Sequence, residues 1–471
     1  MARYSLGAQT VATTGDLSGL SATPGTIVVV EELLDGFMFV AGSTLAQNGV
    51  TVLAGTGGVW QRLGWGAEEW RNQGAWFIDE TNGADTNPGT ALAPLASFDE
   101  FVRRVRGGRL KQLTEVTIIG NLSTGLEGTI ETDRIPNGIE IKGQVVTIGT
   151  HSIAAATALA AATNTPPQIT VAGLDWTAAG YVGKRIRLTT GAGAGATAWV
   201  MKDLGAGAAR LTQWYRQSAG AFAFYGAEQA ALAGDVIAVE NLPVIAGPVD
   251  LMLRTNGPEF VTLANATVRD LEFTNERFAL SSGTQQPVVV MVGLKLAPMR
   301  MFVSATCLSC AVRVISGAGV MPPSAGGNTG PQFQACGFIK DTGSTLPFYG
   351  GVLALFDSGC LSQGVTISLS SGAVGTVGGA SGSGLGIFDV SGNCLMVTHT
   401  SSVDIRSPLW GDNNIGGYAL NCNNWGKYDN VSRFTCVNAG GQLRIGGVVK
   451  LFAELPYWNP SGAASLVLRT T

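Results

Sequence analysis

Residues 76–105 of this 471-residue chain read WFIDETNGADTNPGTALAPLASFDEFVRRV, which is the most specific pattern in the sequence. Trp76–Ile78 is a short apolar strand, and a loop rich in Gly, Asn and Asp follows it. Ser97 and Glu100 then have the spacing of a helix N-cap and its reciprocal acidic partner. Apolar residues recur at helical spacing after the cap, so we predict a helix over 98–106, ended by two glycines.

Oxygen-bearing side chains crowd the loop between the strand and the helix. Asp79, Asp85 and Asn87 lie close together there, as the ligands of a calcium loop would. The glutamate that closes an EF-hand loop is missing, and Asx turns, in which such side chains bond nearby backbone amides, explain the same residues. Since the chain has only two histidines as well, we expect no metal site and no cofactor.

The rest of the chain predicts an all-β fold. Short β-branched segments bounded by Gly or Asn follow the helix, and from about residue 244 to 455 strand succeeds strand without a convincing helix. Between them, strands alternate with turns as in a separate small β-domain. The expected division is an N-terminal module at 1–75, a cap with the first strands at 76–167, an inserted β-domain at 168–243, the main β-region at 244–456 and a tail at 457–471.

Three of these segments resemble a known family. Trp76–Val105 resembles the beginning of the pectate-lyase-like parallel β-helix of phage tailspikes and tail fibres, in which a helix covers the open amino-terminal end. Phe37–Leu63 is similar to modules that precede this β-helix, and Gly183–Met201 resembles a β-domain inserted in this group. The resemblance implies a right-handed parallel β-helix, an N-terminal attachment module and a threefold spike. After residue 245 the chain matches the family in character only.

The charge content bears on assembly. Charged residues make up 13% of the chain and hydrophobic residues 45%, with 29 Lys and Arg against 33 Asp and Glu. A soluble globular protein has about 25% charged residues. Either Gly and Ala inflate the hydropathy of an ordinary β-rich protein, or much surface is buried between subunits. We favour burial between subunits and expect a homotrimer.

The seven cysteines, all after residue 300, predict buried thiols rather than disulfides or a zinc site. Their number is odd, Met1–Val11 does not resemble a signal peptide, and the Cys307-x-x-Cys310 pair has no second pair at zinc-ribbon spacing. Four cysteines recur at intervals typical of coils with loops of uneven length, which predicts a stack of thiols on one face: Cys336, Cys360, Cys394 and Cys422.

Catalysis would require carboxylates, and the distal half of the chain has few. Polysaccharide-cleaving members of the resembled family use carboxylate pairs, which strands about 4.8 Å apart can supply. From Arg277 to Ala453 there is no glutamate, and there are six aspartates. The candidate catalytic residues are Asp389, Asp404 and Asp412, although Asp389 and Asp412 also fit ordinary turns. The sequence favours a role without catalysis, with glycan cleavage as the alternative.

The candidate glycan surface lies in Ser407–Tyr428, where aromatic rings and amides alternate. An aromatic face suits the apolar face of a sugar ring, while placed polar groups fix its orientation. The candidate residues are Trp410, Asn413, Asn414, Tyr418, Trp425 and Tyr428. Asparagines are equally common in turns, so a purely structural interpretation stays open.

The expected function is that of a structural and receptor-binding component of a phage-type virion, a tailspike or tail fibre that binds a host surface polysaccharide. Residues 1–75 are expected to contact other tail or baseplate proteins. No basic run predicts nucleic-acid binding. No apolar run approaches the roughly 20 residues of a membrane span, so membrane insertion is not expected. The expected location is the virion, after synthesis in the host cytoplasm without a signal peptide.

Overall fold

A computed structural model describes most of the chain, with gaps. The described residues are 9–24, 26–30, 35–42, 52–62, 73–105, 109–110, 113–132, 138–160, 165–216, 231–255, 264–275, 277–281, 288–296, 300–303, 306–321, 331–350, 352–357, 359–371, 373–377, 385–390, 395–397, 402–405, 409–411, 418–422, 427–431, 442–445 and 466–468. From residue 397 onward only the backbone of strands is described. No described helix is long and apolar enough to cross a membrane.

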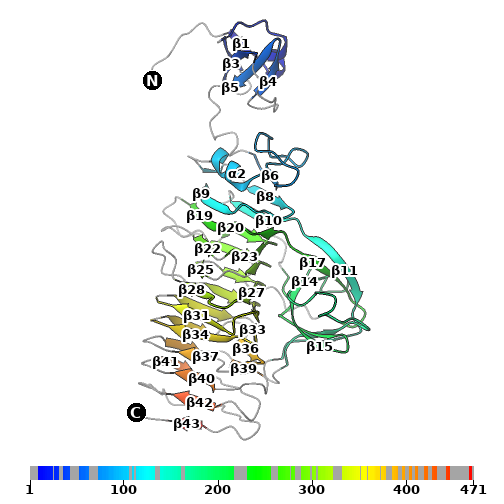
Figure 1. Cartoon of the computed structure of the whole chain (residues 1–471), viewed down its shortest axis with the longest axis vertical. Coiled ribbons are helices and arrows are strands. Elements are labelled where there is room, and N and C mark those ends of the chain that lie inside the picture. Colours follow the sequence, from blue (N-terminus) through cyan, green and yellow to red (C-terminus); the bar gives the residue numbers. More distant parts are fainter. Residues whose placement is uncertain are drawn as a thin grey trace.

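The first folded unit is a small sheet in the order β1-β2-β3-β5-β4, drawn beyond one end of the main body in Figure 1. Its elements are β1 (Gln9–Val11), the 3-10 helix η1 (Thr14–Gly19), β2 (Ile27–Val30), β3 (Asp35–Ala41), β4 (Val52–Gly55) and β5 (Gly58–Arg62). Trp60 is fully buried in its core and donates from its indole Nε1 to the Leu17 carbonyl at 2.8 Å. β4 and β5 pair antiparallel as a hairpin around the turn at Gly55–Gly58.

Most of the chain winds through three sheets, whose described strand pairs are all parallel. Sheet I contains β6 (Ala75–Asp79), β8 (Thr114–Ile119), β10 (Ile139–Gly143), β20 (Ala264–Arg269), β23 (Val288–Val292), β26 (Thr306–Leu308), β29 (Gln332–Gln334), β32 (Leu353–Asp357), β35 (Val374–Val377), β38 (Ser402–Ile405) and β41 (Lys427–Val431). Sheet II contains β18 (Val244–Ile245), β21 (Glu272–Phe273), β24 (Lys295–Leu296), β27 (Ala311–Val314), β30 (Gly337–Lys340), β33 (Cys360–Gln363), β36 (Leu385–Phe388) and β39 (Leu409–Gly411). Sheet III contains β7 (Arg109–Leu110), β9 (Leu126–Thr132), β19 (Val249–Thr255), β22 (Arg277–Ser281), β25 (Arg300–Val303), β28 (Gly319–Met321), β31 (Thr345–Tyr349), β34 (Thr366–Ser370), β37 (Leu395–Val397), β40 (Tyr418–Cys422), β42 (Gln442–Ile445) and β43 (Leu466–Leu468).

Through the middle of the chain, consecutive strands visit sheets I, II and III in turn, so each circuit adds one strand to each sheet (Figure 1). We call this part of the molecule the coil stack. The all-β expectation is confirmed, and the strands expected after residue 244 pair in parallel. Side chains that point inward form one continuous core along the axis, from Trp76 to Leu395 among the described residues. Equivalent positions stack on one another there, as Phe333 of β29 does on Phe356 of β32 at 5.7 Å.

The turn from sheet I to sheet II repeats a left-handed backbone conformation. This conformation costs an L-residue about 1–2 kcal/mol, and it turns the chain sharply within very few residues. The residues that adopt it at this turn have φ between 50° and 75°: Gly120, Asp270, Gly293, Ser309, Ala335 and Gly359. The turn is therefore a fixed corner of the coil stack, and we call it the I–II corner.

The helix α2 (Phe98–Val105) lies at the end of the coil stack that carries β6, as the sequence predicts (Figure 1). Ser97 Oγ accepts a hydrogen bond from the Glu100 amide at 3.2 Å, which confirms one half of the predicted capping box. The other half differs, because Asp85 rather than Glu100 engages the helix start. Asp85 Oδ1 accepts from the backbone amides of Ala96 and Ser97 at 3.0 and 2.9 Å.

Polar side chains of the loop before the helix bond the loop's own backbone. Asp79 Oδ1 accepts from the amides of Thr81 and Asn82, both at 3.0 Å. The side-chain amide of Asn87 donates to the Pro94 carbonyl at 2.9 Å. The Asx-turn interpretation is therefore confirmed for Asp79, whereas Asp85 and Asn87 bond residues farther along the chain.

Glu100 gives the cap a pH dependence. Its carboxylate accepts hydrogen bonds from Arg103 and Arg104, each at 2.6 Å, although its residue is only 8% exposed. Burial would raise the pKa of Glu100, but these hydrogen bonds outweigh burial and lower its pKa below the ordinary 4.5. A carboxyl group whose pKa is lowered on folding stabilises the fold above its unfolded pKa, and this contribution is lost as the pH falls through the folded pKa. The stabilisation by Glu100 is therefore complete above pH 4.5 and declines below it.

We expect Glu100→Gln to lower the Tm at about pH 6, because two arginines lose their anionic partner. Between about pH 6 and pH 3 the variant should lose less stability than the wild type, because it cannot be protonated there. Glu115→Gln is the control, since Glu115 pairs with Lys142 but its side chain is 43% exposed. Tm values measured across this range check the prediction. An equally steep fall of Tm in the Glu100→Gln variant would contradict it.

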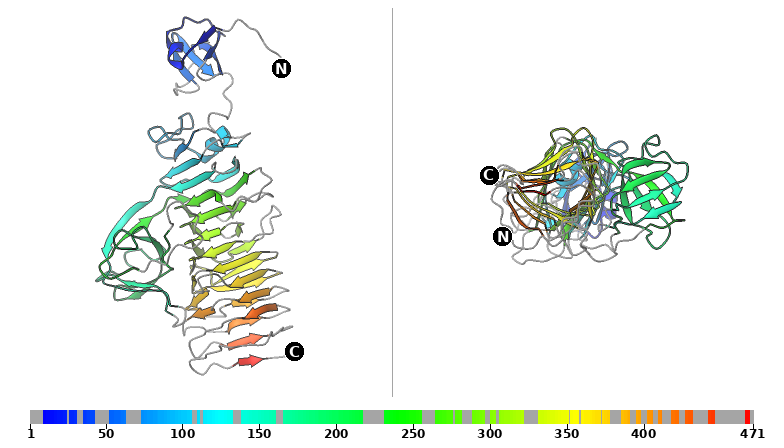
Figure 2. Two further views of the ribbon diagram at one scale, coloured as in Figure 1. Left: turned by 180° about the vertical axis from the view of Figure 1, so that it is seen from behind. Right: turned by 90° about the horizontal axis from the view of Figure 1, so that it is seen from below.

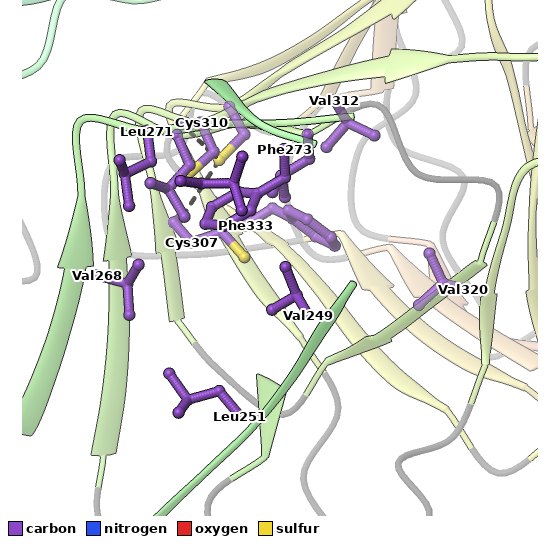
Figure 3. Close-up of a cluster of buried hydrophobic side chains, with 14 of the residues drawn as sticks. Val249, Leu251, Val268, Leu271, Phe273, Cys307, Cys310, Val312, Val320 and Phe333 are labelled. Carbon is purple, nitrogen blue, oxygen red and sulfur yellow. Dashed lines mark hydrogen bonds between the residues drawn. The ribbon is translucent and has the colours of Figure 1, made fainter. Parts of the chain in front are cut away.

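Free thiols line the I–II corner (Figure 3). The register Ala311↔Gly337↔Leu361 places the preceding residues, Cys310, Cys336 and Cys360, at equivalent positions of successive coils. The Cys336 thiol donates to the Cys307 carbonyl at 3.2 Å, and burial raises its pKa well above the ordinary value. The four cysteines whose side chains are described, Cys307, Cys310, Cys336 and Cys360, are buried and form no disulfide, which confirms the prediction of buried thiols for them.

The prediction of which cysteines form the thiol stack was partly wrong. Cys310 belongs to it, whereas Cys422 lies in β40 of sheet III. Cys394 falls outside the described residues. Separation along the sequence misassigned these positions because the loops between strands differ in length from coil to coil.

A separate antiparallel sheet interrupts the coil stack between β10 and β18 and lies beside it (Figure 2). Its order is β11-β17-β14-β15-β16-β13-β12 in the described part of the chain, and we call it the inserted sheet. The strands are β11 (Val146–Ser152), β12 (Ala155–Thr157), β13 (Gln168–Thr170), β14 (Arg185–Leu188), β15 (Thr197–Gly205), β16 (Ala208–Leu211) and β17 (Val236–Asn241).

The inserted sheet begins before the expected boundary at residue 168. β11 pairs antiparallel with β17, and β12 pairs antiparallel with β13, so Val146–Thr157 belongs to the insertion and not to the first coils. The sequence could not show this, because a β-branched segment has the same alternation whether it pairs with a coil or with an inserted strand.

Candidate functional site

The inserted sheet docks on sheet II through an apolar contact. Trp199 and Met201 of β15 pack against residues of four successive sheet II strands, and all of them are at most 8% exposed: Ala311, Ile339, Leu361 and Phe388. Trp199 also donates from Nε1 to the Ser309 carbonyl at 2.7 Å. A Cβ added to Gly337 would lie 2.5 Å from Thr212 Cγ2, so the two surfaces touch closely. The docking is therefore a packed interface rather than a loose tether.

A charged cluster closes the distal side of this interface. Asp389 Oδ2 accepts hydrogen bonds from Lys202 Nζ at 2.6 Å, Gln363 Nε2 at 2.6 Å and Arg210 Nη1 at 3.1 Å. The Arg210 guanidinium also lies 4.5 Å from the centre of the Phe388 ring. Lys202 and Arg210 come from the inserted sheet, so Asp389 joins it to the coil stack.

A second charged cluster holds the side nearer the I–II corner. Arg185 of β14 bonds Glu240 Oε2 from Nε at 2.7 Å and Asp270 Oδ1 from Nη1. The Arg185 side chain is 5% exposed and that of Glu240 is 2% exposed. Burial alone would lower the pKa of Arg185, but the carboxylates of Asp270 and Glu240 raise it above its ordinary value. Arg185 therefore remains a fixed cation between the inserted sheet and the corner.

Beside this cluster lies a pocket of about 300 Å³ between the inserted sheet and the I–II corner. The volume is at the small end of the range for ligand pockets, which favour such junctions between domains. Strands β11, β14, β15 and β17 form one wall, and Arg269, Asp270 and Gly293 form the other. The remaining lining residues are Val145, Thr147, Arg185, Arg187, Gly195, Thr197, Tyr215 and Glu240. We call this cavity the corner pocket.

The chemistry of the corner pocket suits binding better than acid–base catalysis. Glu240 accepts from Arg185 Nε and from Arg187 Nε, the latter at 2.5 Å. Asp270 accepts from Arg185 and from Arg269 Nη1, the latter at 2.7 Å. Glycoside hydrolysis requires one carboxyl group that is kept as an acid in a less polar setting. In the corner pocket each carboxylate is instead bonded to two guanidinium groups, which is a charged rather than a less polar setting.

The structure separates the candidate catalytic aspartates. Asp389 lies in the docking interface described above. Asp404 lies on β38 of sheet I, where its backbone pairs with Thr376 on one side and Asp429 on the other. Asp412 falls outside the described residues. A catalytic role for any of the three stays a prediction.

The candidate glycan residues that are described lie in three different sheets. Trp410 is on β39 of sheet II, Tyr418 on β40 of sheet III and Tyr428 on β41 of sheet I. Asn413, Asn414 and Trp425 fall outside the described residues. The backbone therefore does not gather these residues on one sheet face, and the predicted glycan surface remains untested.

The sequence contained a signal for the corner pocket that composition did not reveal. Arg185 and Arg187 alternate with Ile186 and Leu188 on β14, so both arginines lie on one face of a strand and the apolar residues on the other. Two arginines on one strand face predict an anion or a pair of carboxylates opposite them. The partners come from distant parts of the chain, and only the docked structure shows them.

Solved structures that are similar to the chain include a phage tailspike and a glycoside hydrolase. No protein-family model matches the chain, and no curated protein matches it. The Gp54 tailspike of Acinetobacter baumannii bacteriophage AP22, solved in complex with A. baumannii capsular saccharide, is 10% identical with a TM-score of 0.23, over 76% of this chain and 74% of that chain. The GH136 lacto-N-biosidase from Eubacterium ramulus is 10% identical with a TM-score of 0.23, over 86% of this chain and 68% of that chain. At this TM-score neither similarity establishes a shared fold.

Proposed function

We propose that the chain is a structural and receptor-binding component of a phage-type virion, a tailspike or tail fibre that binds a host surface glycan. The observation that carries the proposal is the long coil stack, covered at one end by α2 and preceded there by a separate small sheet. We propose further that the stack is a right-handed parallel β-helix. Such a rod grows from a capped end, and its flank offers an extended surface for a polymeric ligand.

The order of the parts supports a direction of attachment. The small sheet at residues 9–62 lies before the capped end, while β43 lies at the opposite end (Figure 1). Residues 1–75 would join other tail or baseplate proteins, and the coil stack would project towards the host. Three copies would form the spike, since the low charge content leaves apolar surface for subunit contacts. Light scattering should then give three times the 48.6 kDa of one chain.

One observation favours a second candidate function, a depolymerase that cleaves the glycan. Asp404 and Asp429 are register partners on β38 and β41. Adjacent strands are about 4.8 Å apart, and the carboxyl groups of a retaining glycosidase are about 5 Å apart. Like charges at neighbouring positions destabilise a sheet. The presence of two aspartates there therefore favours a functional role over a stabilising one.

Incubation of the purified protein with extracted capsule or O-antigen of its host distinguishes the two functions. We expect the protein to bind the polysaccharide without releasing new reducing ends or unsaturated uronates. Release of oligosaccharide that disappears in Asp404→Asn would replace the binding function with the depolymerase. Failure to bind any surface polysaccharide of the host would reject both. Deletion of residues 1–75 should preserve glycan binding and abolish incorporation into particles, and normal incorporation would contradict the assigned attachment end.

A further inference from the structure

We propose that the corner pocket binds a singly charged, carboxylated sugar unit of the host glycan. The inference rests on the proposed function, which it makes more specific. It also assigns a purpose to the inserted sheet. That sheet provides one wall of a cavity that neither it nor the coil stack has alone.

Two guanidinium groups are available to a ligand carboxylate. Arg187 uses Nε for Glu240, and within the described residues the structure gives no partner to its two Nη atoms. The Arg187 side chain is 39% exposed, so these donors are accessible. Arg269 uses Nε for Glu140 and Nη1 for Asp270, and no described residue bonds its Nη2. Arginine can bind a carboxylate through two parallel hydrogen bonds, and the free edge of Arg187 has this geometry.

The charge balance of the lining favours a monoanion. Among the lining residues, three arginines face the two carboxylates of Glu240 and Asp270, an excess of one positive charge, and Arg269 is also bonded to Glu140 outside the lining. A uronate carries one negative charge and matches this excess. A sugar phosphate carries nearly two negative charges at neutral pH, and the two carboxylates in the wall would repel the second one.

The other lining residues suit the neutral part of a sugar. Thr147 and Thr197 supply hydroxyl groups that both donate and accept, as sugar hydroxyls require. Tyr215 is 6% exposed, and burial raises its pKa to about 12, so its phenol stays protonated as a donor. Val145 and the Tyr215 ring provide apolar surface for the ring face.

The pocket is held in shape before any ligand arrives. Arg185 bonds both walls at once, through Glu240 of the inserted sheet and Asp270 of the corner. Asp270 has φ 61°, and its carboxylate also fixes Arg269. Preorganised groups lose little conformational freedom on binding, so a small pocket can still be selective.

The test titrates the full-length protein with galacturonate trimer, maltotriose and glucose 1-phosphate by calorimetry. We expect binding of the uronate only, weakened about tenfold or more in Arg187→Gln, because a hydrogen bond to a charged group is lost. Arg187→Lys keeps the charge without the paired donors and should be intermediate. Arg313→Gln is the matched control, since Arg313 is 45% exposed and pairs with one carboxylate, Asp341, at 3.0 Å. It should bind the uronate as the wild type does, and the Tm of each variant reports its folding.

Equal binding of maltotriose, or uronate binding that Arg187→Gln leaves unchanged, would overturn the inference. Preference for glucose 1-phosphate would overturn the choice of a carboxylate. This test and the test of the proposed function can fail independently of each other. If the protein binds host polysaccharide while Arg187→Gln changes nothing, the site is wrong and the function stands. If uronate binding depends on Arg187 but host polysaccharide is not bound, the function is wrong and the site stands.

Discussion

Trp199→Ala is expected to release the inserted sheet from the coil stack while the sheet itself stays folded. Trp199 is 1% exposed, fills the apolar interface with sheet II and bonds the Ser309 carbonyl. Truncation of a buried tryptophan to alanine costs about 3–5 kcal/mol. At this position the lost free energy weakens docking, because Trp199 packs against residues of sheet II and not against the core of the inserted sheet.

Trp176→Ala is the matched control for this experiment. Trp176 is also fully buried and also donates from Nε1 to a carbonyl, that of Gly207 at 2.8 Å, but it lies in the core of the inserted sheet itself. We expect this variant to unfold the inserted sheet rather than undock it. Hydrogen exchange distinguishes the two results, since Trp199→Ala should expose amides of sheet II and spare β14 and β17. Unchanged protection of sheet II in Trp199→Ala would contradict the prediction.

Arg185→Met should cost about 3 kcal/mol or more, because it leaves two carboxylates at the docking interface without their shared cation. Glu240 and Asp270 have side chains only 2% and 14% exposed, so water cannot replace the lost partner fully. Adding Glu240→Gln to the variant should recover part of the loss, since it removes a buried carboxylate that has kept only one of its two guanidinium partners, Arg187. Arg187→Met provides the comparison and should cost about 1 kcal/mol or less, because its side chain is 39% exposed.

Chemical denaturation of the wild type, Arg185→Met, the double variant and Arg187→Met checks the predicted order of their unfolding free energies. The informative quantity is the difference in unfolding free energy between Arg185→Met and the double variant, which reports the cost of the Glu240 carboxylate once it has lost Arg185. Equal losses of unfolding free energy in Arg185→Met and Arg187→Met would contradict the prediction that the buried ion pair contributes more than the exposed one.

Local patterns predicted much of the fold. Ser97 and the apolar spacing after it predict α2, and the strand–turn–strand pattern around Gly55–Gly58 predicts the hairpin of β4 and β5. Both depend on neighbours in the sequence. The start of the inserted sheet depends instead on which distant strand β11 pairs with, and alternation alone does not specify a partner.

The candidate site was less predictable for the same physical reason. Asp389 was selected as a carboxylate near a strand end, and the structure adds three partners that belong to the docking of the inserted sheet. The walls of the corner pocket come from β14, β17 and the turn at Asp270, which lie far apart in the chain. Sequence shows which residues carry charge, but docking decides which charges meet.

The I–II corner has a consequence for engineering. β10 pairs with β20 in parallel register, Ile139 with Ala266 and Lys142 with Arg269, although the whole inserted sheet lies between them in the sequence. The entropy of closing a loop grows only with the logarithm of its length. A coil therefore tolerates a long insertion at a corner that is only two residues long between β20 and β21. This junction is thus a natural graft point, at which foreign binding modules could replace Val146–Asn241 while the coils on either side keep their register.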